Sequence, residues 1–151
     1  MATLSRFEQL KVWQDARSFD RMLFAVIKDA DERRDGFLKN HILKTSGSIM
    51  DNIAESFERD GNREFIQFLS ISKGSAGELR SQLYRALDHE MIRQNDFEIL
   101  QSNLVSLSQQ LSNFIKYLNS SSLRGNKFKE SRTIYSINNK LDQFFTEDLE
   151  D

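Results

Sequence analysis

The sequence of 151 residues contains neither cysteine nor proline, and each absence narrows what the protein can be. A chain without cysteine has no disulfide, no thiolate nucleophile and no cysteine-ligated zinc or iron–sulfur site. A chain without proline favours long uninterrupted helices over a β fold rich in turns. The lack of cysteine also fits a reducing compartment, and we expect a cytoplasmic protein.

Strong net charge and long apolar runs are lacking as well. The formal net charge is −2 and the pI about 5.8, so the overall charge argues neither for nor against a nucleic-acid partner. No run approaches the roughly 18 apolar residues of a membrane span. The first 17 residues are charged and lack the continuous apolar region of a secretory signal. We therefore expect one soluble domain without a membrane partner.

What the sequence does contain is helical spacing of apolar residues in four long segments. These segments run over residues 9–31, 37–58, 63–92 and 95–119. The charged cluster at 29–35, closed by Gly36, is predicted to form the first turn. Asn95 is predicted to cap the fourth helix, with Glu98 completing a capping-box exchange. The pattern predicts an all-α fold, an antiparallel up-down-up-down four-helix bundle over residues 1–119.

The second and third segments carry small residues on both sides of the polar break at 58–62. The small residues are Ser46, Gly47, Ser48, Ser72, Gly74, Ser75, Ala76 and Gly77. A glycine inside a helix costs roughly 1 kcal/mol relative to alanine. Keeping both Gly74 and Gly77 therefore predicts close contact between helix backbones at these positions. We interpret the two segments as the central hairpin of the bundle.

Polar residues near the apolar stripes of this hairpin have two possible roles. Asn52, Glu55 and Glu78 are either catalytic or members of a buried hydrogen-bond network that fixes the register of the helices, and we favour the network. Trp13 and Phe19 are likewise interpreted as core residues rather than as a stacking platform.

The histidines and glycines do not form a known catalytic motif. His41 and His89 both lack the glutamate three residues earlier that a di-iron bundle requires. The sequence around Lys73 lacks the glycine and the residue order of a phosphate-binding loop. No serine, histidine and acid arrangement supplies a nucleophile. We expect no metal, no cofactor and no enzymatic activity.

Basic residues recur at helical spacing in two helices. Arg17, Arg21 and Lys28 share one side of the first helix, and Lys73 and Arg80 share one side of the third. In a monomer these residues are ordinary solvated charges. In a closed ring they are repeated around an axis, and the resulting basic belt binds a phosphate backbone. Both interpretations stay open at this stage.

The fourth helix has no charged residue between positions 101 and 115. This stretch is either a neutral polar exterior or a face buried against another subunit, where charge is costly.

Residues 120–151 form a tail that begins basic and ends acidic. Apolar residues keep helical spacing within it: Ile134, Ile137, Leu141, Phe144, Phe145 and Leu149. This spacing predicts a short amphipathic fifth helix that docks on its own bundle, on a neighbouring copy or on a partner. The alternative is a disordered tail with chance periodicity.

Several of these motifs together resemble the bacterial "four helix bundle protein" family. The residues that carry the resemblance are FEQLKVW at 7–13, NIAE at 52–55 and EFIQFL at 64–69, followed by Gly74-Ser75, Glu78-Leu79 and Gln82-Leu83. The family includes proteins encoded in intervening sequences of large-subunit ribosomal RNA genes and the Avd accessory proteins of diversity-generating retroelements. This chain departs from the family pattern at Ser56, usually glycine, and at Met50-Asp51, often proline, so we expect a straighter second helix.

The resemblance implies a homopentameric, barrel-like ring. In the Avd branch it also implies binding to RNA and to a reverse transcriptase. Our leading interpretation is a non-enzymatic oligomeric bundle that binds RNA or DNA, or serves as a ribonucleoprotein accessory subunit. The alternative is a protein–protein scaffold that recruits a partner through the C-terminal helix.

Overall fold

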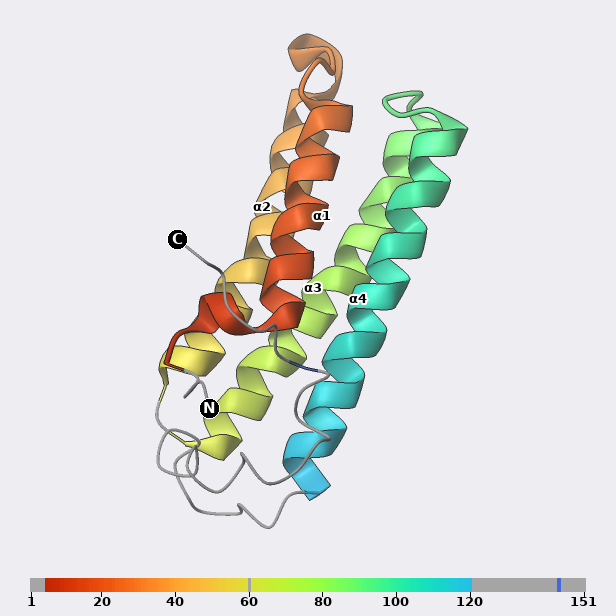
Figure 1. Ribbon diagram of the computed structural model, residues 1–151. Coiled ribbons are helices and arrows are strands. Elements are labelled where there is room, and N and C mark those ends of the chain that lie inside the picture. Colours follow the sequence, from red (N-terminus) through yellow and green to blue (C-terminus); the bar gives the residue numbers. More distant parts are fainter. Residues whose placement is uncertain (1–4, 60, 121–143, 145–151) are drawn as a thin grey trace.

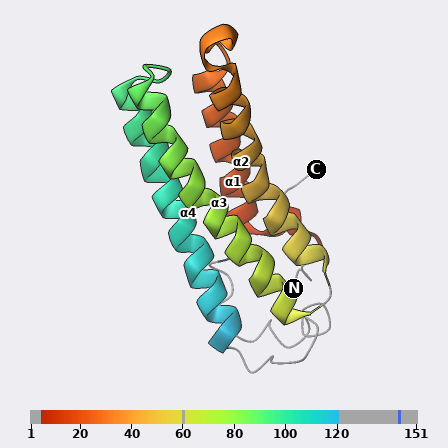
Figure 2. The same cartoon turned by 180° about the vertical axis from the view of Figure 1, so that it is seen from behind.

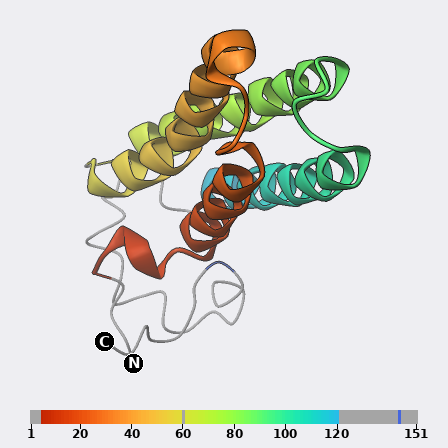
Figure 3. The ribbon, with the colours of Figure 1, turned by 90° about the horizontal axis from the view of Figure 1, so that it is seen from above.

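Four antiparallel helices make up the computed structural model, which describes residues 5–59, 61–120 and 144 (Figure 1). The helices are α1 (Lys11–Ile27), α2 (Glu32–Glu58), α3 (Asn62–Asp88) and α4 (Gln94–Ser120), and a short 3-10 helix, η1 (Phe7–Gln9), precedes α1. Seen from above, α2 and α3 form one layer while α1 and α4 form the other (Figure 3). The described ranges contain no strand. The predicted all-α, up-down-up-down fold is confirmed.

Every helix contributes one apolar stripe to a single core. Near the end of the bundle that holds the turn between α2 and α3, the ring of Phe65 lies 5.4 Å from that of Phe114 and 6.5 Å from that of Phe57, both edge to face. All three side chains are almost completely buried. Burying a large apolar side chain contributes about 1.5–3 kcal/mol, so these stripes supply most of the driving force for folding. The layer of α2 and α3 packs most extensively, and Figure 2 shows it from behind.

The first turn is shorter than the sequence predicted, because an aspartate starts α2 early. The side chain of Asp31 accepts a hydrogen bond from the backbone N–H of Arg33 at 2.9 Å and caps a helix that begins at Glu32. Glu32 and Asp35 place negative charge in that first turn, next to the positive end of the helix dipole, and so stabilise the start of α2. The predicted start at Phe37 is therefore wrong, and Gly36 lies inside the helix rather than in the turn.

The first helix is also shorter than predicted. Leu10 adopts an extended backbone, with φ −73° and ψ 119°, and this separates η1 from α1. At the other end, Ile27 is the last helical residue and the N–H of Lys28 still bonds to the carbonyl of Phe24 at 2.9 Å. Both predicted ends of the 9–31 segment lie outside the regular helix.

The third helix ends four residues before the predicted Ile92, because Glu90 adopts a left-handed backbone with φ 57°. The N–H of Met91 bonds to the carbonyl of Ala86 at 2.9 Å, and the N–H of Glu90 bonds to that of Leu87 at 2.9 Å. This pair of bonds is a Schellman motif, which usually has glycine at the left-handed position.

The predicted cap of the fourth helix is wrong by a small margin. The helix begins at Gln94, so Asn95 lies inside it. Glu98 accepts a hydrogen bond from the Gln94 side chain at 3.0 Å instead of bonding back to Asn95. The other end was expected at Asn119, and the helix reaches Ser120.

The break between α2 and α3 lies close to its predicted place. The second helix runs continuously through Met50 and Ser56 and ends at Glu58. Gly61 then precedes α3 with φ 118°, a conformation that glycine adopts at little cost.

The two glycines of α3 do not provide the close contact that the sequence predicted. Gly74 and Gly77 lie on the exposed side of the helix, and a Cβ built on either meets no atom within 4 Å. The close approach of α2 and α3 depends on serines instead. The Ser72 hydroxyl donates to the carbonyl of Ile49 at 2.8 Å, and the hydroxyls of Ser48 and Ser75 lie 3.0 Å apart. The interpretation of Gly74 and Gly77 as helix-contact residues is therefore wrong within this chain.

Among the described helices, none combines the length and apolar character needed to cross a membrane. Of the predicted tail helix, only Phe144 is described. Ile134, Ile137, Leu141 and Phe145 lie outside the described residues, and the predicted boundary between bundle and tail stays a prediction.

Candidate nucleic-acid interface

One outer side of α1 gathers three basic side chains around an exposed aromatic ring. Arg17, Arg21, Phe24 and Lys28 fall within an arc of about 60° at the 100° per residue of a helix. All four are exposed, and Phe24 leaves 51% of its surface in solvent. We name these four residues the α1 strip. Sequence reasoning found its basic members but missed Phe24; the signal was an apolar residue off the core stripe of its helix.

The α1 strip carries three positive charges and no negative one. Within residues 5–59 and 61–120, no acidic side chain forms an ion pair with Arg17, Arg21 or Lys28. The neighbouring Asp20 is half-buried and accepts a hydrogen bond from the Ser46 hydroxyl of α2 at 2.7 Å. Its carboxylate therefore faces α2, and the three cations keep their charge available to a ligand.

Trp13 contacts the α1 strip at the end where Arg17 lies. The guanidinium of Arg17 lies 5.8 Å from the centre of the Trp13 ring, within reach of a cation–π contact. The Trp13 ring packs edge to face on Phe7 at 5.0 Å and against the core, while Phe19 is 4% exposed. The interpretation of Trp13 and Phe19 as packing residues is confirmed.

The other predicted basic pair lies elsewhere. Lys73 and Arg80 are exposed on α3, which sits diagonally across the bundle from α1 (Figure 3). The Arg80 side chain donates to Gln101 of α4 at 3.3 Å, and the Gln101 amide donates back to the Arg80 carbonyl at 2.8 Å. One chain therefore presents two separate basic sites, of which the α1 strip is the larger.

The predicted polar network is three separate sites. Asn52 donates to the carbonyl and hydroxyl of Ser48, at 2.7 and 3.0 Å, and so extends the Ser48–Ser75 contact. Glu55 is exposed and pairs with Arg59, and this hydrogen bond raises the pKa of Arg59. Glu78 is exposed as well. A single buried network of the three is therefore wrong, because both glutamates reach the surface.

A comparison with known protein families places the chain in one of them. The chain matches the model of the 23S rRNA-intervening sequence protein family over residues 8–113. The protein belongs to this family. The match covers the four residues of the α1 strip and stops before the end of α4. No curated protein matches the chain.

The polar contacts that sequence reasoning missed join α2 to α3, and one of them is buried. Gln82 is 4% exposed and donates to the Thr45 hydroxyl at 3.0 Å and to Glu78 at 3.3 Å. Glu78 also lies 3.4 Å from His41 of α2. The signal was the spacing of Ser75 and Gln82, which are one heptad apart on the side of α3 that faces α2.

Phe144, predicted as a partner-binding residue of the tail, contacts the bundle of its own chain. Its ring is half-buried and stacks on Phe114 of α4. The other predicted members of that set, Ile134, Ile137, Leu141 and Phe145, are outside the described residues.

Proposed function

We propose that this member of the 23S rRNA-intervening sequence protein family is a non-enzymatic, oligomeric bundle that binds RNA through the α1 strip. Its role is that of a nucleic-acid-binding or ribonucleoprotein accessory subunit. The observation that carries the proposal is the strip itself, three cations that form no ion pair among the described residues, around an exposed Phe24. A phosphate backbone needs clustered cations, and an unpaired base stacks on an exposed aromatic ring.

The dimensions of the strip suit a nucleic-acid backbone. Arg17 lies in α1 and Lys28 directly follows it with a helical backbone; the eleven positions between them correspond to about 17 Å at 1.5 Å per residue. Phosphates along one strand of a duplex are spaced by about 3.4 Å of helix axis, so the strip spans about five of them. Phe24 lies within that span, where it stacks on a base in a loop or a single-stranded segment.

The proposal includes a homopentameric ring, which the family resemblance implies, and a cytoplasmic location. Assembly repeats the strip five times, and repeated weak sites bind one long ligand much more tightly than a single site does. The uncharged stretch of α4 at 101–115 supports a contact between subunits. One apolar side chain within this stretch, Val105, is 48% exposed in the single chain.

The resemblance to retroelement accessory proteins adds a reverse transcriptase as the proposed protein partner. Genomic context separates the two branches of the family. A neighbouring reverse-transcriptase gene favours the retroelement role, and a position inside a ribosomal RNA gene favours the other.

An electrophoretic mobility shift assay with a structured RNA hairpin tests the proposal. We expect a shift at low salt that weakens at high salt, and at least a tenfold loss of affinity, roughly, in the triple variant Arg17→Glu, Arg21→Glu, Lys28→Glu. Reversal of the exposed Arg63, Arg85 and Lys116, which lie off the strip, is the matched control and should cost much less. No shift at low salt, or an unchanged shift in the triple variant, contradicts the proposal.

Two further variants test the second basic site and the stacking role of Phe24 separately. Reversal of Lys73 and Arg80 together shows whether the second basic site contributes. Phe24→Ala keeps every charge, so it should weaken binding to a hairpin loop more than binding to a fully paired duplex. Equal effects on both RNAs would remove the stacking role.

The mass of the protein in solution tests the ring independently of any ligand. Five copies of the 17.7 kDa chain give about 89 kDa. A single species of 17.7 kDa at high concentration would contradict the assembly, and RNA binding by that species would leave the strip proposal standing alone.

A further inference from the structure

A groove runs between α1 and α4, the two helices of one layer. It consists of two consecutive hollows, of about 270 and 350 Å³, that share Lys11 and Gln110. The flanks of the two helices form its walls: Lys11, Asp15, Ser18 and Met22 from α1, and Asn103, Ser106, Gln110 and Asn113 from α4. Lys11 pairs with Asp15, so the walls carry no net charge.

The floor of the groove is apolar. Val12, Phe19 and Leu107 line it, and each is at most 4% exposed in the bundle. A groove with an apolar floor and neutral polar walls suits an amphipathic segment that inserts its apolar side and leaves its polar side in solvent.

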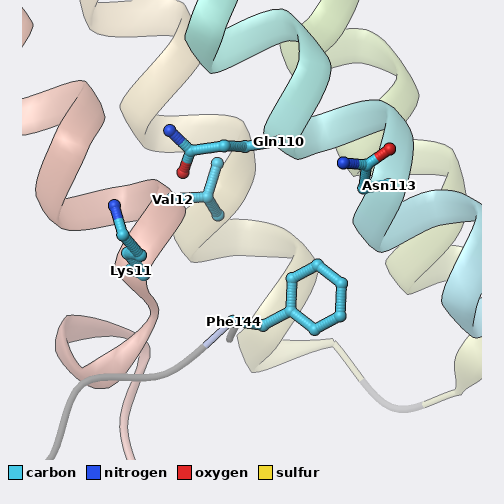
Figure 4. A pocket seen from close by; sticks show the side chains of 5 residues that line it. All are labelled: Lys11, Val12, Gln110, Asn113 and Phe144. Atoms are coloured by element: carbon cyan, nitrogen blue, oxygen red, sulfur yellow. The ribbon is translucent and has the colours of Figure 1, made fainter. Parts of the chain in front are cut away.

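Phe144 already occupies one end of this groove (Figure 4). Its ring stacks on Phe114 with centroids 4.9 Å apart and an interplanar angle of 18°, and it lies 5.6 Å from the ring of Tyr117. Aromatic pairs of this kind contribute about 0.5–1.5 kcal/mol beyond the area that they bury. The two rings that hold Phe144, those of Phe114 and Tyr117, belong to α4, whereas Phe144 itself comes from the C-terminal part of the chain.

We propose that the groove between α1 and α4 is the docking site of the chain's own C-terminal segment, residues 134–149, with Phe144 as its anchor. The remaining groove extends from Asn113 to Asn103, about ten positions or 15 Å along α4. The apolar set from Ile134 to Phe144 covers the same ten positions and, at helical spacing, the same 15 Å.

The connecting chain is long enough for this arrangement. Residue 134 opposite Asn103 lies about 26 Å back along α4 from Ser120, at 1.5 Å per residue. Residues 121–133 can span up to about 43 Å when extended, at about 3.3 Å per residue. The segment then runs in the same direction as α4, with Phe144 near the end of that helix.

Docking bears on the alternative function, recruitment of a partner by the tail. A partner that binds the apolar side of the segment must first displace Phe144 from Phe114 and Tyr117. The bundle and the partner therefore compete for one surface of the tail, and the measured affinity for a partner is lowered by the fraction of tails that are docked.

Paramagnetic relaxation enhancement tests the docking in the full-length chain. The protein has no native cysteine, so Gln109→Cys places a single spin label beside the groove without lining it. We expect this label to broaden the amide signals of residues 134–144. A label at Ser70→Cys, exposed on α3 in the opposite layer, is the matched control and should leave those signals sharp.

The anchor is tested by substitution in the labelled protein. Phe144→Ala should abolish the broadening, while Phe128→Ala, the same change elsewhere in the tail, should leave it intact. Circular dichroism checks that the bundle stays folded in both. Equal broadening from the two labels, or none from Gln109→Cys, overturns the proposal, and an unchanged result in Phe144→Ala overturns the anchor.

A mixing experiment separates the chain's own tail from that of a second copy. Spin-labelled chains without isotope are mixed with isotope-labelled chains without spin label. Broadening confined to the doubly labelled chain supports docking within one molecule. Broadening of equal strength in the mixed sample means that the groove holds the tail of a neighbour, and it overturns the proposal as stated.

Discussion

Replacing the two exposed glycines of α3 by alanine should stabilise the protein. A Cβ at Gly74 or Gly77 meets no atom within 4 Å, so the substitution adds no clash. Alanine inside a helix is better than glycine by roughly 0.8–1.0 kcal/mol, so the two changes together should raise the free energy of unfolding by about 2 kcal/mol. For a chain of 151 residues each kcal/mol corresponds to a rise in Tm of about 2–4 °C.

Urea denaturation followed by circular dichroism measures this effect, with Gly61→Ala as the contrasting variant. Gly61 has φ 118°, so alanine there is strained and should lower stability by about 1 kcal/mol or more. A loss of stability in Gly77→Ala with an unchanged mass in solution would refute the argument that alanine fits at this position without a clash. A fall in mass instead would place the α3 glycines in a contact between copies.

Three other substitutions follow from the core and the turns. Phe65→Ala removes the ring between Phe57 and Phe114 and should cost about 3–5 kcal/mol in urea denaturation, and a cost below about 1 kcal/mol would contradict the packing. Glu90→Gly should gain about 0.5–1 kcal/mol because it relieves the left-handed φ of 57°, whereas Glu90→Ala should gain nothing. Gln82→Met should stay within about 1 kcal/mol of the parent. The Gln82 Oε1 lacks a partner among the described residues, and Thr45 keeps its hydrogen bond to the carbonyl of His41; a larger loss would indicate a partner there.

The four helices and their order could be predicted because apolar spacing fixes which face of each helix turns inward. Residues such as Leu69, Leu83 and Leu111 lie at the predicted positions and are completely buried. The exact helix ends could not be predicted. They depend on single backbone conformations, such as the left-handed Glu90 and the extended Leu10, which residue type alone does not indicate.

The candidate interface was only partly predictable for a related reason. Spacing placed Arg17, Arg21 and Lys28 on one side of a helix, and the structure keeps them there. The predicted up-down-up-down order already implies that α1 and α3 lie diagonally, and in the structure this separates Lys73 and Arg80 from the strip. Small size does not tell a contact glycine from an exposed one, so Gly74 and Gly77 were assigned to the wrong side of α3.

The salt dependence of RNA affinity tests the α1 strip most directly. A plot of log K against log salt concentration should be linear, with a negative slope set by the number of phosphates that the cations neutralise. In the double variant Arg17→Gln, Arg21→Gln the slope should become less steep by at least about 1, while the same change at Arg85 and Lys116 should leave it unaltered. Identical slopes for the parent protein and the strip variant would contradict the account.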